Sequence, residues 1–328
     1  MSTRPAATRR LALSIVAPCF NEAQGLALFV ERTMAAAAAV VGAAYELILV
    51  NDGSRDATWE VIRRLADSHA SVVGVNLTRN HGHQLSVTAG LSLARGERVM
   101  IIDADLQDPP ELLSQMMARM DEGYDVVYGR RRTRADESRL KLATAAIFYR
   151  VLGRLSEVDI PVDTGDFRLM SRRIVERLNA MPEHDRYLRG MVAWLGGAQA
   201  ELLYDRDPRY AGQTGYTLRK MLRLAVNGVT SFSTAPLKAA VVFAVIGILI
   251  AVGILIYALG GFLTGKVEPG WTSLALIMVF FGISQLGCLA IIGAYVGRAY
   301  MQLKGRPLFL IDEIATQGRR PSPPDKAA

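Results

Sequence analysis

The chain has 328 residues, which is enough for two ordinary domains. Its formal net charge of +7 favours partners such as nucleic acid, an anionic membrane surface or a phosphorylated substrate. The two cysteines, Cys19 and Cys288, lie far apart, which excludes a disulfide framework, and no Cys/His cluster has the spacing of a zinc site.

The N-terminus looks like a targeting signal because three arginines precede the apolar run 11–20. However, the run is short, Pro18 interrupts it, and no small-residue cleavage pattern follows. We therefore expect a first strand at 13–17 and an N-terminal half that stays in the cytoplasm.

Strands and helices are predicted to alternate as far as Tyr128. Apolar runs without polar alternation predict buried strands, and longer segments with one apolar face predict helices. The expected strands are 45–50, 72–77, 98–102 and 125–128. Of the expected helices, one ends at about 41, one spans 57–68, one ends at 94 and one spans 110–122. This alternation predicts an α/β domain with a mostly parallel sheet covered on both faces.

Polar segments follow three of these strands: Asn21-Glu22 in the loop 18–22, Asp52, and the pair Asp103 and Asp105. Ligands of parallel sheets bind outside the carboxyl ends of the strands, so we expect these side chains to line one crevice. A dinucleotide-binding dehydrogenase would carry Gly-x-Gly-x-x-Gly after its first strand. The loop at 18–22 lacks it, which disfavours that class of enzyme.

The segment 99–111 is a buried strand that ends in acids. Asp103, Asp105 and Gln107 supply the carboxylate and amide oxygens that Mg²⁺ and Mn²⁺ prefer, with phosphate oxygens completing the shell. An ordinary acidic turn is the alternative, because Asp favours turns. His81 and His83 share a nearby loop, but a metal site built on those two histidines lacks further ligands.

Two basic amphipathic helices are predicted, at 138–155 and 216–229. Their apolar faces and basic sides are typical of helices that lie on a membrane surface, and ordinary core helices are the alternative. Ser171 to Tyr204 is expected to form helix, helix and strand.

Two long apolar stretches follow, and neither 239–265 nor 269–297 contains a charged residue. A membrane-spanning helix needs about 20 apolar residues, so each is long enough. The short connection predicts an antiparallel hairpin, and the basic residues on its outer flanks place both ends in the cytoplasm. The final residues, 321–328, are expected to be disordered.

The motifs together resemble those of family 2 glycosyltransferases. They are Pro-x-x-Asn-Glu at 18–22, Asn-Asp-Gly-Ser at 51–54, Asp-Ala-Asp-Leu-Gln-Asp-Pro-Pro-Glu at 103–111, Asp-Thr-Gly-Asp-Phe-Arg-Leu at 163–169, and the C-terminal helix pair. More narrowly, the chain is similar to polyprenyl-phosphate glycosyltransferases, which include dolichol-phosphate mannose synthase and the bacterial bactoprenol glucosyltransferases. The resemblance extends from about Ser14 to Asp312. The stretches at 79–84, 88–91 and 230–234 are most like the bactoprenol glucosyl type.

This resemblance implies a GT-A catalytic domain that moves one sugar, with inversion, from a nucleotide diphosphate sugar to a lipid monophosphate. UDP-glucose and undecaprenyl phosphate are the first candidates, and mannose, a hexosamine or an aminoarabinose derivative remain open as the sugar. The implied organisation is a cytoplasmic catalytic domain at 1–210 that includes the first interface helix, a second interface helix at 211–237, inner-membrane helices at 238–265 and 270–297, and a cytoplasmic tail at 298–328. A homotetramer is also expected.

The family's functional residues match positions of this chain. The nucleotide-binding positions correspond to Pro18, Asn21, Glu22, Asp52 and Asp103, and the Mg²⁺ or Mn²⁺ site corresponds to Asp103, Asp105 and Gln107. The proposed catalytic carboxylate corresponds to Asp166, and Asp105 is also expected to be a catalytic residue. Two departures are Phe20, where the family usually has Tyr, and Thr214-Gly215-Tyr216, which lacks a lysine that is common there.

Both substrates are anions, so the reaction must overcome their repulsion. Basic side chains are expected to hold the acceptor phosphate, with candidates Arg131, Arg139, Lys141 and Arg168. A phosphate monoester has its second pKa near 6 and is mostly deprotonated at neutral pH. We therefore expect Asp166 to orient the acceptor or sugar and not to act as a base.

Two other functions compete with this interpretation. A processive polysaccharide synthase usually has more membrane helices and a Gln-x-x-Arg-Trp motif, which this chain lacks. A non-catalytic membrane adaptor that binds nucleotide sugar would not need acids at every motif. Nucleic acid is not an expected partner, because no aromatic side chains interleave with the basic runs.

Overall fold

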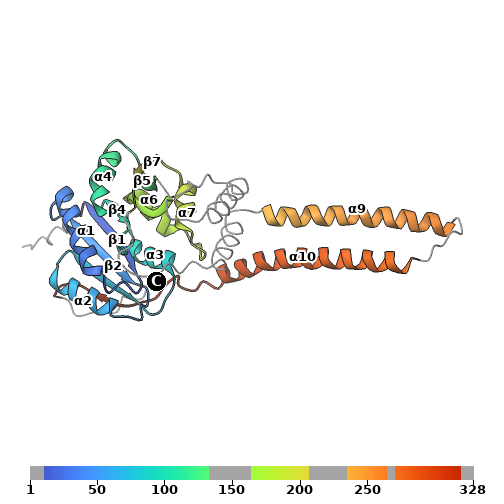
Figure 1. Cartoon of the computed structure of the whole chain (residues 1–328), viewed down its shortest axis with the longest axis horizontal. Coiled ribbons are helices and arrows are strands. Elements are labelled where there is room, and N and C mark those ends of the chain that lie inside the picture. Colours follow the sequence, from blue (N-terminus) through green and yellow to red (C-terminus); the bar gives the residue numbers. More distant parts are fainter. Residues whose placement is uncertain (1–10, 133–163, 207–234, 264–269, 319–328) are drawn as a thin grey trace, which may run out of the picture. The chain divides into compact units, whose positions relative to one another are not determined.

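The computed structural model describes residues 11–132, 164–206, 235–263 and 270–318 (Figure 1). They belong to two units: one holds the sheet, its helices and the segment from Pro307, and the other holds two long helices. The predicted interface helices at 138–155 and 216–229 lie outside the described residues, and so do Arg139 and Lys141.

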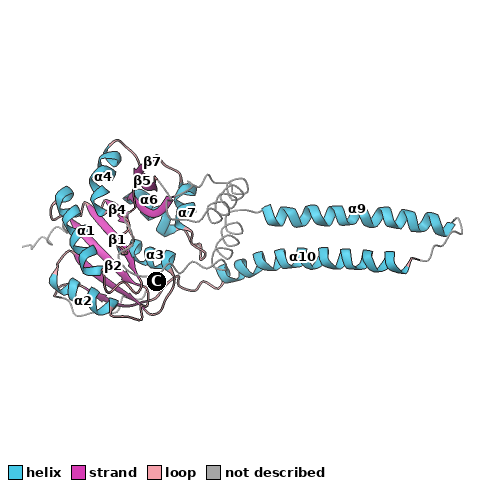
Figure 2. Cartoon of the chain, in the orientation of Figure 1, coloured by secondary structure: helices cyan, strands magenta, loops and turns pink. Residues whose placement is uncertain are grey.

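The first unit is built on one eight-stranded sheet, with strand order β7-β5-β6-β4-β1-β2-β3-β8. Figure 2 shows strands of this sheet in magenta. The strands are β1 (Leu13–Cys19), β2 (Tyr45–Asn51), β3 (Val72–Leu77), β4 (Arg98–Ile101), β5 (Val126–Arg131), β6 (Thr164–Ser171), β7 (Gln199–Tyr204) and β8 (Ile311–Ala315). β4, β1, β2 and β3 run parallel, as do β5 and β7, while β6 and β8 are antiparallel to their neighbours. The predicted mostly parallel α/β sheet is confirmed.

Helices of the first unit cover both faces of the sheet. They are α1 (Leu26–Val41), α2 (Thr58–Ser68), α3 (His83–Leu93), the 3₁₀ turn η1 (Pro110–Leu112), α4 (Leu113–Asp121), α6 (Arg172–Ala180) and α7 (Leu188–Leu195). Successive side chains of a strand point to opposite faces, so Ile15 packs in the core that includes Phe29 of α1, while Val16 lies against Gly90 of α3. β1 and β2 are buried on both faces, which explains why their sequences show no polar alternation.

A buried carboxylate, Glu46, fastens the amino ends of β1 and β2 to the segment that follows α3. Its Oε1 accepts hydrogen bonds from Ser14 Oγ and the Arg95 N–H, both at 2.7 Å, and its Oε2 accepts from Arg95 Nε at 2.9 Å. Ser14 Oγ in turn accepts the Gly96 N–H at 2.7 Å. All of these groups lie far from the carboxyl ends of the strands, so this network contributes to stability.

We expect Glu46→Ala to lower the free energy of unfolding by about 2–3 kcal/mol, because buried donors lose their acceptor. Thermal unfolding of the purified chain in detergent would measure the effect as a lower midpoint. Glu31→Ala is the matched control, since Glu31 is an exposed acid on α1. Equal midpoints for the two variants would contradict this role of Glu46.

β8 is a strand within 298–328, where the sequence predicts a tail. The strand pairs antiparallel with β3 and forms one edge of the sheet. Its sequence, Ile-Asp-Glu-Ile-Ala, carries two adjacent acids and lacks a strict period of two, so its strand character comes from its pairing with β3.

The second unit contains α9 (Ala235–Leu263) and α10 (Trp271–Leu303), which contact one another. The two helices run antiparallel in Figure 1, and Cys288 Sγ lies 3.5 Å from the Ala240 carbonyl oxygen. Within the described residues, Ile277–Leu303 is the stretch that is long and apolar enough to cross a membrane, and Ala240–Ile254 is a shorter apolar stretch. Many apolar side chains on both helices are exposed.

Candidate active site

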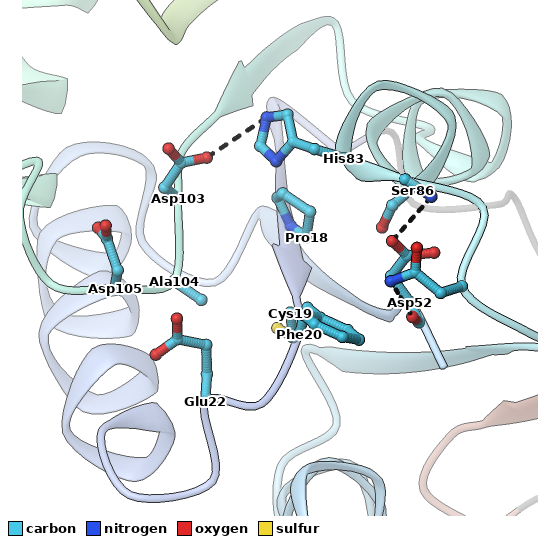
Figure 3. A pocket seen from close by; sticks show the side chains of 12 residues that line it. Pro18, Cys19, Phe20, Glu22, Asp52, His83, Ser86, Asp103, Ala104 and Asp105 are labelled. Atoms are coloured by element: carbon cyan, nitrogen blue, oxygen red, sulfur yellow. Dashed lines mark hydrogen bonds and ion pairs between the residues drawn. The ribbon is translucent and has the colours of Figure 1, made fainter. Parts of the chain in front are cut away.

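A pocket lies at the carboxyl ends of the parallel strands β1, β2 and β4, where ligands of such sheets bind (Figure 3). It is lined by Pro18, Cys19, Phe20, Glu22, Asp52, Asn80, Gly82, His83, Ser86, Asp103, Ala104 and Asp105. The carboxyl groups of Glu22, Asp103 and Asp105 gather at one end, and Asp52 lies at the other end beside Ser86. Five predicted site residues, Pro18, Glu22, Asp52, Asp103 and Asp105, are therefore brought together.

The loop after β1 is fixed by hydrogen bonds to the loop after β2. Asn21 has φ of 58°, a left-handed conformation that Asn tolerates better than most residues. Its N–H donates to Ser54 Oγ at 3.0 Å, and its Oδ1 accepts the Arg55 N–H at 2.9 Å. The Glu22 N–H donates to Thr58 Oγ1 at 3.0 Å. Asn21 does not line the pocket but holds the loop that carries Pro18 and Glu22.

Asp52 joins the loop after β2 to the start of α3. Its two carboxylate oxygens accept the His81 N–H at 2.7 Å and the Gly82 N–H at 3.0 Å. Gly53 has φ of +62°, and a Cβ there would lie 2.5 Å from the Asn80 nitrogen, so this contact requires glycine. Burial raises the pKa of Asp52, against the opposite effect of the two backbone N–H groups.

His83 reaches the pocket because α3 packs very closely on β1. A Cβ on Gly90 would lie 2.3 Å from Val16 Cγ1, so only glycine permits this approach. The same helix places Ser86 in the wall, where its buried Oγ has no hydrogen-bond partner among the described residues. A buried hydroxyl without a partner costs free energy, so it is suited to a polar ligand.

Asp103 and Asp105 follow β4 on one short turn. Asp105 is 8% exposed, and its Oδ1 accepts the Gln107 N–H at 3.2 Å. Asp103 Oδ1 is buried without a hydrogen-bond partner in the described part of the chain. Burial raises the pKa of Asp103 to about 6, although the neighbouring His83 opposes this shift.

The acidic end of the pocket fits a divalent cation by its chemistry. No three His, Cys, Asp or Glu side chains converge on a metal position within the described ranges. The two carboxylates in the pocket wall, Asp103 and Asp105, leave room for phosphate oxygens, which Mg²⁺ and Mn²⁺ accept as ligands. Asp103 Oδ1 accepts no hydrogen bond from the described residues, so it is an oxygen that a cation could take as a partner.

Asp166 on β6 is 5% exposed and lies among three hydrogen-bond donors. Arg189 Nε donates to its Oδ1 at 2.8 Å, while Gln84 Nε2 at 2.9 Å and His83 Nε2 at 3.0 Å contact its Oδ2. Gln84 also accepts the Leu188 N–H at 2.9 Å, which ties α3 to α7. His83 Nε2 lies 3.7 Å from Asp103 Oδ1, so the imidazole links Asp166 to the pocket.

The pKa values of Asp166 and His83 are shifted in opposite directions. Burial alone would raise the pKa of Asp166, but Arg189 and His83 hold it well below its usual range. Burial would lower the pKa of His83, but Asp166 and Asp103 raise it to about 9. At neutral pH, Asp166 is therefore ionised, His83 is protonated, and the carboxylate is a weak base.

Another polar cluster lies behind the acidic turn. Tyr204 Oη donates to Asp108 Oδ1 at 2.5 Å, and Asp108 is 1% exposed. Arg206 contacts both Asp108 Oδ1 at 3.4 Å and Asp105 Oδ2 at 3.7 Å. Arg131, which is in register with Tyr204, lies at the end of β5 next to this cluster.

Arg168, which is predicted to contact an acceptor phosphate, lies on β6 next to Asp166. It is 4% exposed and donates to the Gly165 carbonyl oxygen at 3.1 Å. Burial lowers the pKa of Arg168 to about 10. Its guanidinium lies 3.9 Å from Asp166, and its Nε is buried without a hydrogen-bond partner among the described residues, so its contact with the acceptor phosphate stays a prediction.

Sequence reasoning missed most of the partners of Asp166. Gln84 and His83 belong to the Arg-Asn-His-Gly-His-Gln stretch at 79–84. Its sequence indicates only a resemblance to the bactoprenol glucosyl type and an incomplete two-histidine metal site. No motif marks Arg189, and only the fold of α7 against β6 brings it to the carboxylate.

Residues 14–178 match the family model described as glycosyl transferase family 2. The chain is 41% identical over 306 residues to an uncharacterized glycosyltransferase of Synechocystis sp., covering 92% of this chain and 95% of that protein. It is 36% identical over 306 residues to the prophage bactoprenol glucosyl transferase homolog of Escherichia coli, and the match covers 92% of this chain and 99% of that protein. Among solved structures, S. aureus TarS in complex with UDP-GlcNAc aligns with a TM-score of 0.47 and 14% identity over 68% of this chain and 67% of that one.

Proposed function

The chain belongs to glycosyl transferase family 2, and on that basis we propose that it transfers a single sugar from a nucleoside diphosphate sugar to polyprenyl phosphate at a membrane surface, with inversion. The observation that carries this proposal is the convergence of Asp52, Asp103 and Asp105 in one pocket at the carboxyl ends of parallel strands. A relative of similar length named bactoprenol glucosyl transferase homolog supports a prenyl phosphate acceptor and makes UDP-glucose the first candidate donor. A mannose, hexosamine or aminoarabinose donor is the alternative.

The two ends of the pocket suit the two ends of the donor. Asp52 and the Ser86 hydroxyl offer polar contacts to a nucleobase or ribose, and the exposed ring of Phe20 offers an apolar face for the base. Asp103 and Asp105 at the other end face the diphosphate, a pairing of like charges that needs a cation.

Asp103, Asp105 and Gln107 would hold that cation, Mg²⁺ or Mn²⁺. When bound, it supplies positive charge that offsets the diphosphate and the charge that grows on the leaving group. Arg206 stands against Asp105 and Asp108 in this structure, so the protein keeps these acids compensated by its own cation.

Asp166 serves to orient groups, because a carboxylate with a strongly depressed pKa accepts protons poorly. The acceptor phosphate is already mostly deprotonated at neutral pH, with its second pKa near 6. Asp166 instead fixes His83 Nε2–H between itself and Asp103, at the boundary of the donor pocket. The imidazolium there offsets part of the negative charge that the two substrates bring together.

Arg131 is the described residue best placed for the acceptor phosphate. It lies at the end of β5, and one guanidinium nitrogen is 3.6 Å from where a Cβ on Gly165 would be, next to Asp166 in sequence. Arg139 and Lys141 remain proposed partners of the acceptor, and they lie outside the described residues. Arginine suits this role because its planar fork binds phosphate with two hydrogen bonds.

The apolar helices α9 and α10 are proposed to form an inner-membrane hairpin with the catalytic domain and both termini in the cytoplasm. Their antiparallel contact and exposed apolar side chains support this arrangement. The basic residues that flank the hairpin, Lys238 before it and Arg298, Lys304 and Arg306 after it, agree with the positive-inside tendency. A homotetramer is a further proposal.

The reaction can be tested directly with the purified chain in detergent. It would be mixed with undecaprenyl phosphate, Mg²⁺ or Mn²⁺ and a panel of labelled nucleotide sugars, and then extracted with organic solvent. We expect label in the lipid phase from one donor, lost with EDTA, and none when undecaprenol replaces its phosphate. Nucleotide release or polymer without labelled lipid would show that the proposed acceptor is wrong.

A further inference from the structure

We infer that Asp312 on β8 positions the loop 51–54 of the donor pocket through the side-chain amides of Asn76 and Asn51. This inference rests on the proposed function in one respect, because it assumes that the pocket beside Asp52 binds the donor. It makes the segment that follows the apolar helices a working part of the active site.

We call the hydrogen bonds that run from Asp312 through Asn76 and Asn51 to the Ser54 N–H the relay. Asp312 reaches this relay because β8 carries a β-bulge. Asn76 pairs with Glu313 and Leu77 pairs with Ile311, so Asp312 is the extra residue between the two pairs. A bulge of this kind redirects a side chain and is common next to active sites. Asp312 Oδ2 accepts a hydrogen bond from Asn76 Nδ2 at 3.2 Å.

The carboxylate sets the direction of every hydrogen bond that follows. A carboxylate only accepts, so Asn76 must turn its NH₂ toward Asp312 and its oxygen toward Asn51. Asn51 Nδ2 donates to that oxygen at 2.7 Å, which leaves Asn51 Oδ1 to accept the Ser54 N–H at 3.3 Å. Asn51 is buried, so reversing its amide would leave two donors facing each other away from water.

The loop held by this relay supports both walls of the pocket. Ser54 Oγ accepts the N–H of Asn21, which carries the loop after β1, and Asp52 accepts the N–H groups that precede His83. A displaced loop 51–54 would therefore move the nucleotide contacts first. We therefore expect loss of the relay to weaken donor binding more than it slows the transfer step.

The test inverts the relay and then restores it. Asp312→Lys replaces an acceptor by a donor and forces the Asn76 amide to reverse. Adding Asn76→Asp gives the ammonium a carboxylate partner whose second oxygen again accepts from Asn51. Glu313→Lys is the matched control, because it makes the same charge change on β8 at a carboxylate that faces Arg63 at 3.8 Å.

We expect Asp312→Lys to raise the donor KM about fivefold with kcat changed less than about twofold, as loss of one net hydrogen bond predicts. The double variant and Glu313→Lys should both stay within about twofold of wild type. Hydrogen–deuterium exchange of residues 51–56 should quicken in Asp312→Lys alone. Hydrogen–deuterium exchange needs no turnover, so it tests the relay even if the wild-type chain transfers no sugar. A wild-type chain without transfer would count against the proposed function only. An unchanged exchange rate in Asp312→Lys, or no recovery in the double variant, would overturn the inference.

Discussion

The Asp105→Ala variant is expected to transfer sugar at least about 100-fold more slowly than the wild-type chain at any concentration of Mg²⁺ or Mn²⁺. Asp105 is 8% exposed and lies on the same turn as Asp103, so its loss removes one of two charged oxygen ligands proposed for the cation. A single carboxylate and an amide bind a hard divalent ion weakly. The transition state would then keep most of the repulsion between the diphosphate and the acceptor phosphate.

The fold should survive this change, which makes the activity loss interpretable. Arg206 keeps Asp108 as an ion-pair partner at 3.4 Å, and Asp108 keeps its hydrogen bond from Tyr204. The thermal unfolding midpoint is therefore expected to shift by no more than a few degrees.

Glu122→Ala removes an exposed acid of the same domain, paired only locally with Arg119, and is expected to keep activity within about twofold. Isothermal titration with Mn²⁺ and UDP would show whether Asp105→Ala also weakens their joint binding. Full activity of Asp105→Ala with EDTA present would rule out the metal model.

The position of the pocket could be predicted from the sequence because parallel strands bring their carboxyl ends to one edge. Asp52 and Asp103 are far apart in the chain, but each follows a strand that lies beside β1. Once the strands were recognised as parallel, the convergence of the polar segments followed from topology alone. The same reasoning placed Asn21 and Glu22 at this edge, and of these two Glu22 lines the pocket.

The environment of Asp166 could not be predicted in this way. Its partners Gln84 and Arg189 come from the starts of α3 and α7, and their contacts depend on helix packing that no local pattern encodes. The burial of Arg168 could not be predicted either, because it depends on the packing around β6 and not on a local pattern. β8 was missed because its strand character depends on pairing with β3, across a sequence gap that includes both apolar helices.

The acid cluster and the Asp166 cluster meet at one side chain, His83. Its Nε2 is 3.0 Å from Asp166 Oδ2 and 3.7 Å from Asp103 Oδ1. Because carboxylates accept but do not donate, this nitrogen must carry a proton. We therefore expect a change at Asp166 to reach the pocket through the charge and orientation of His83.

We expect Asp166→Asn to reduce transfer by about 100-fold, with no recovery between about pH 6 and pH 9. A lost base would be replaced by hydroxide at high pH, whereas a lost orienting charge would not. The variant should also bring the pKa of His83 down from about 9 toward its ordinary value, because its main anionic partner is gone. NMR of isotope-labelled histidine in the full chain would measure that pKa, with only four histidines to assign.

The same pair predicts how stability depends on pH. The pKa of His83 is raised to about 9 in the folded state, so protonation of His83 stabilises the fold. This contribution is complete below the unfolded pKa of about 6.5 and is lost as the pH rises through about 9. The thermal midpoint of the wild-type chain should therefore fall between pH 6.5 and pH 9 more than that of Asp166→Asn. Asp125→Asn is the matched control, since Asp125 also pairs with an arginine, Arg173 at 2.6 Å, away from the pocket, and it should keep activity within about twofold. A normal rate of Asp166→Asn at high pH alone would favour a base role, because only a group that removes a proton can be replaced by hydroxide in solution.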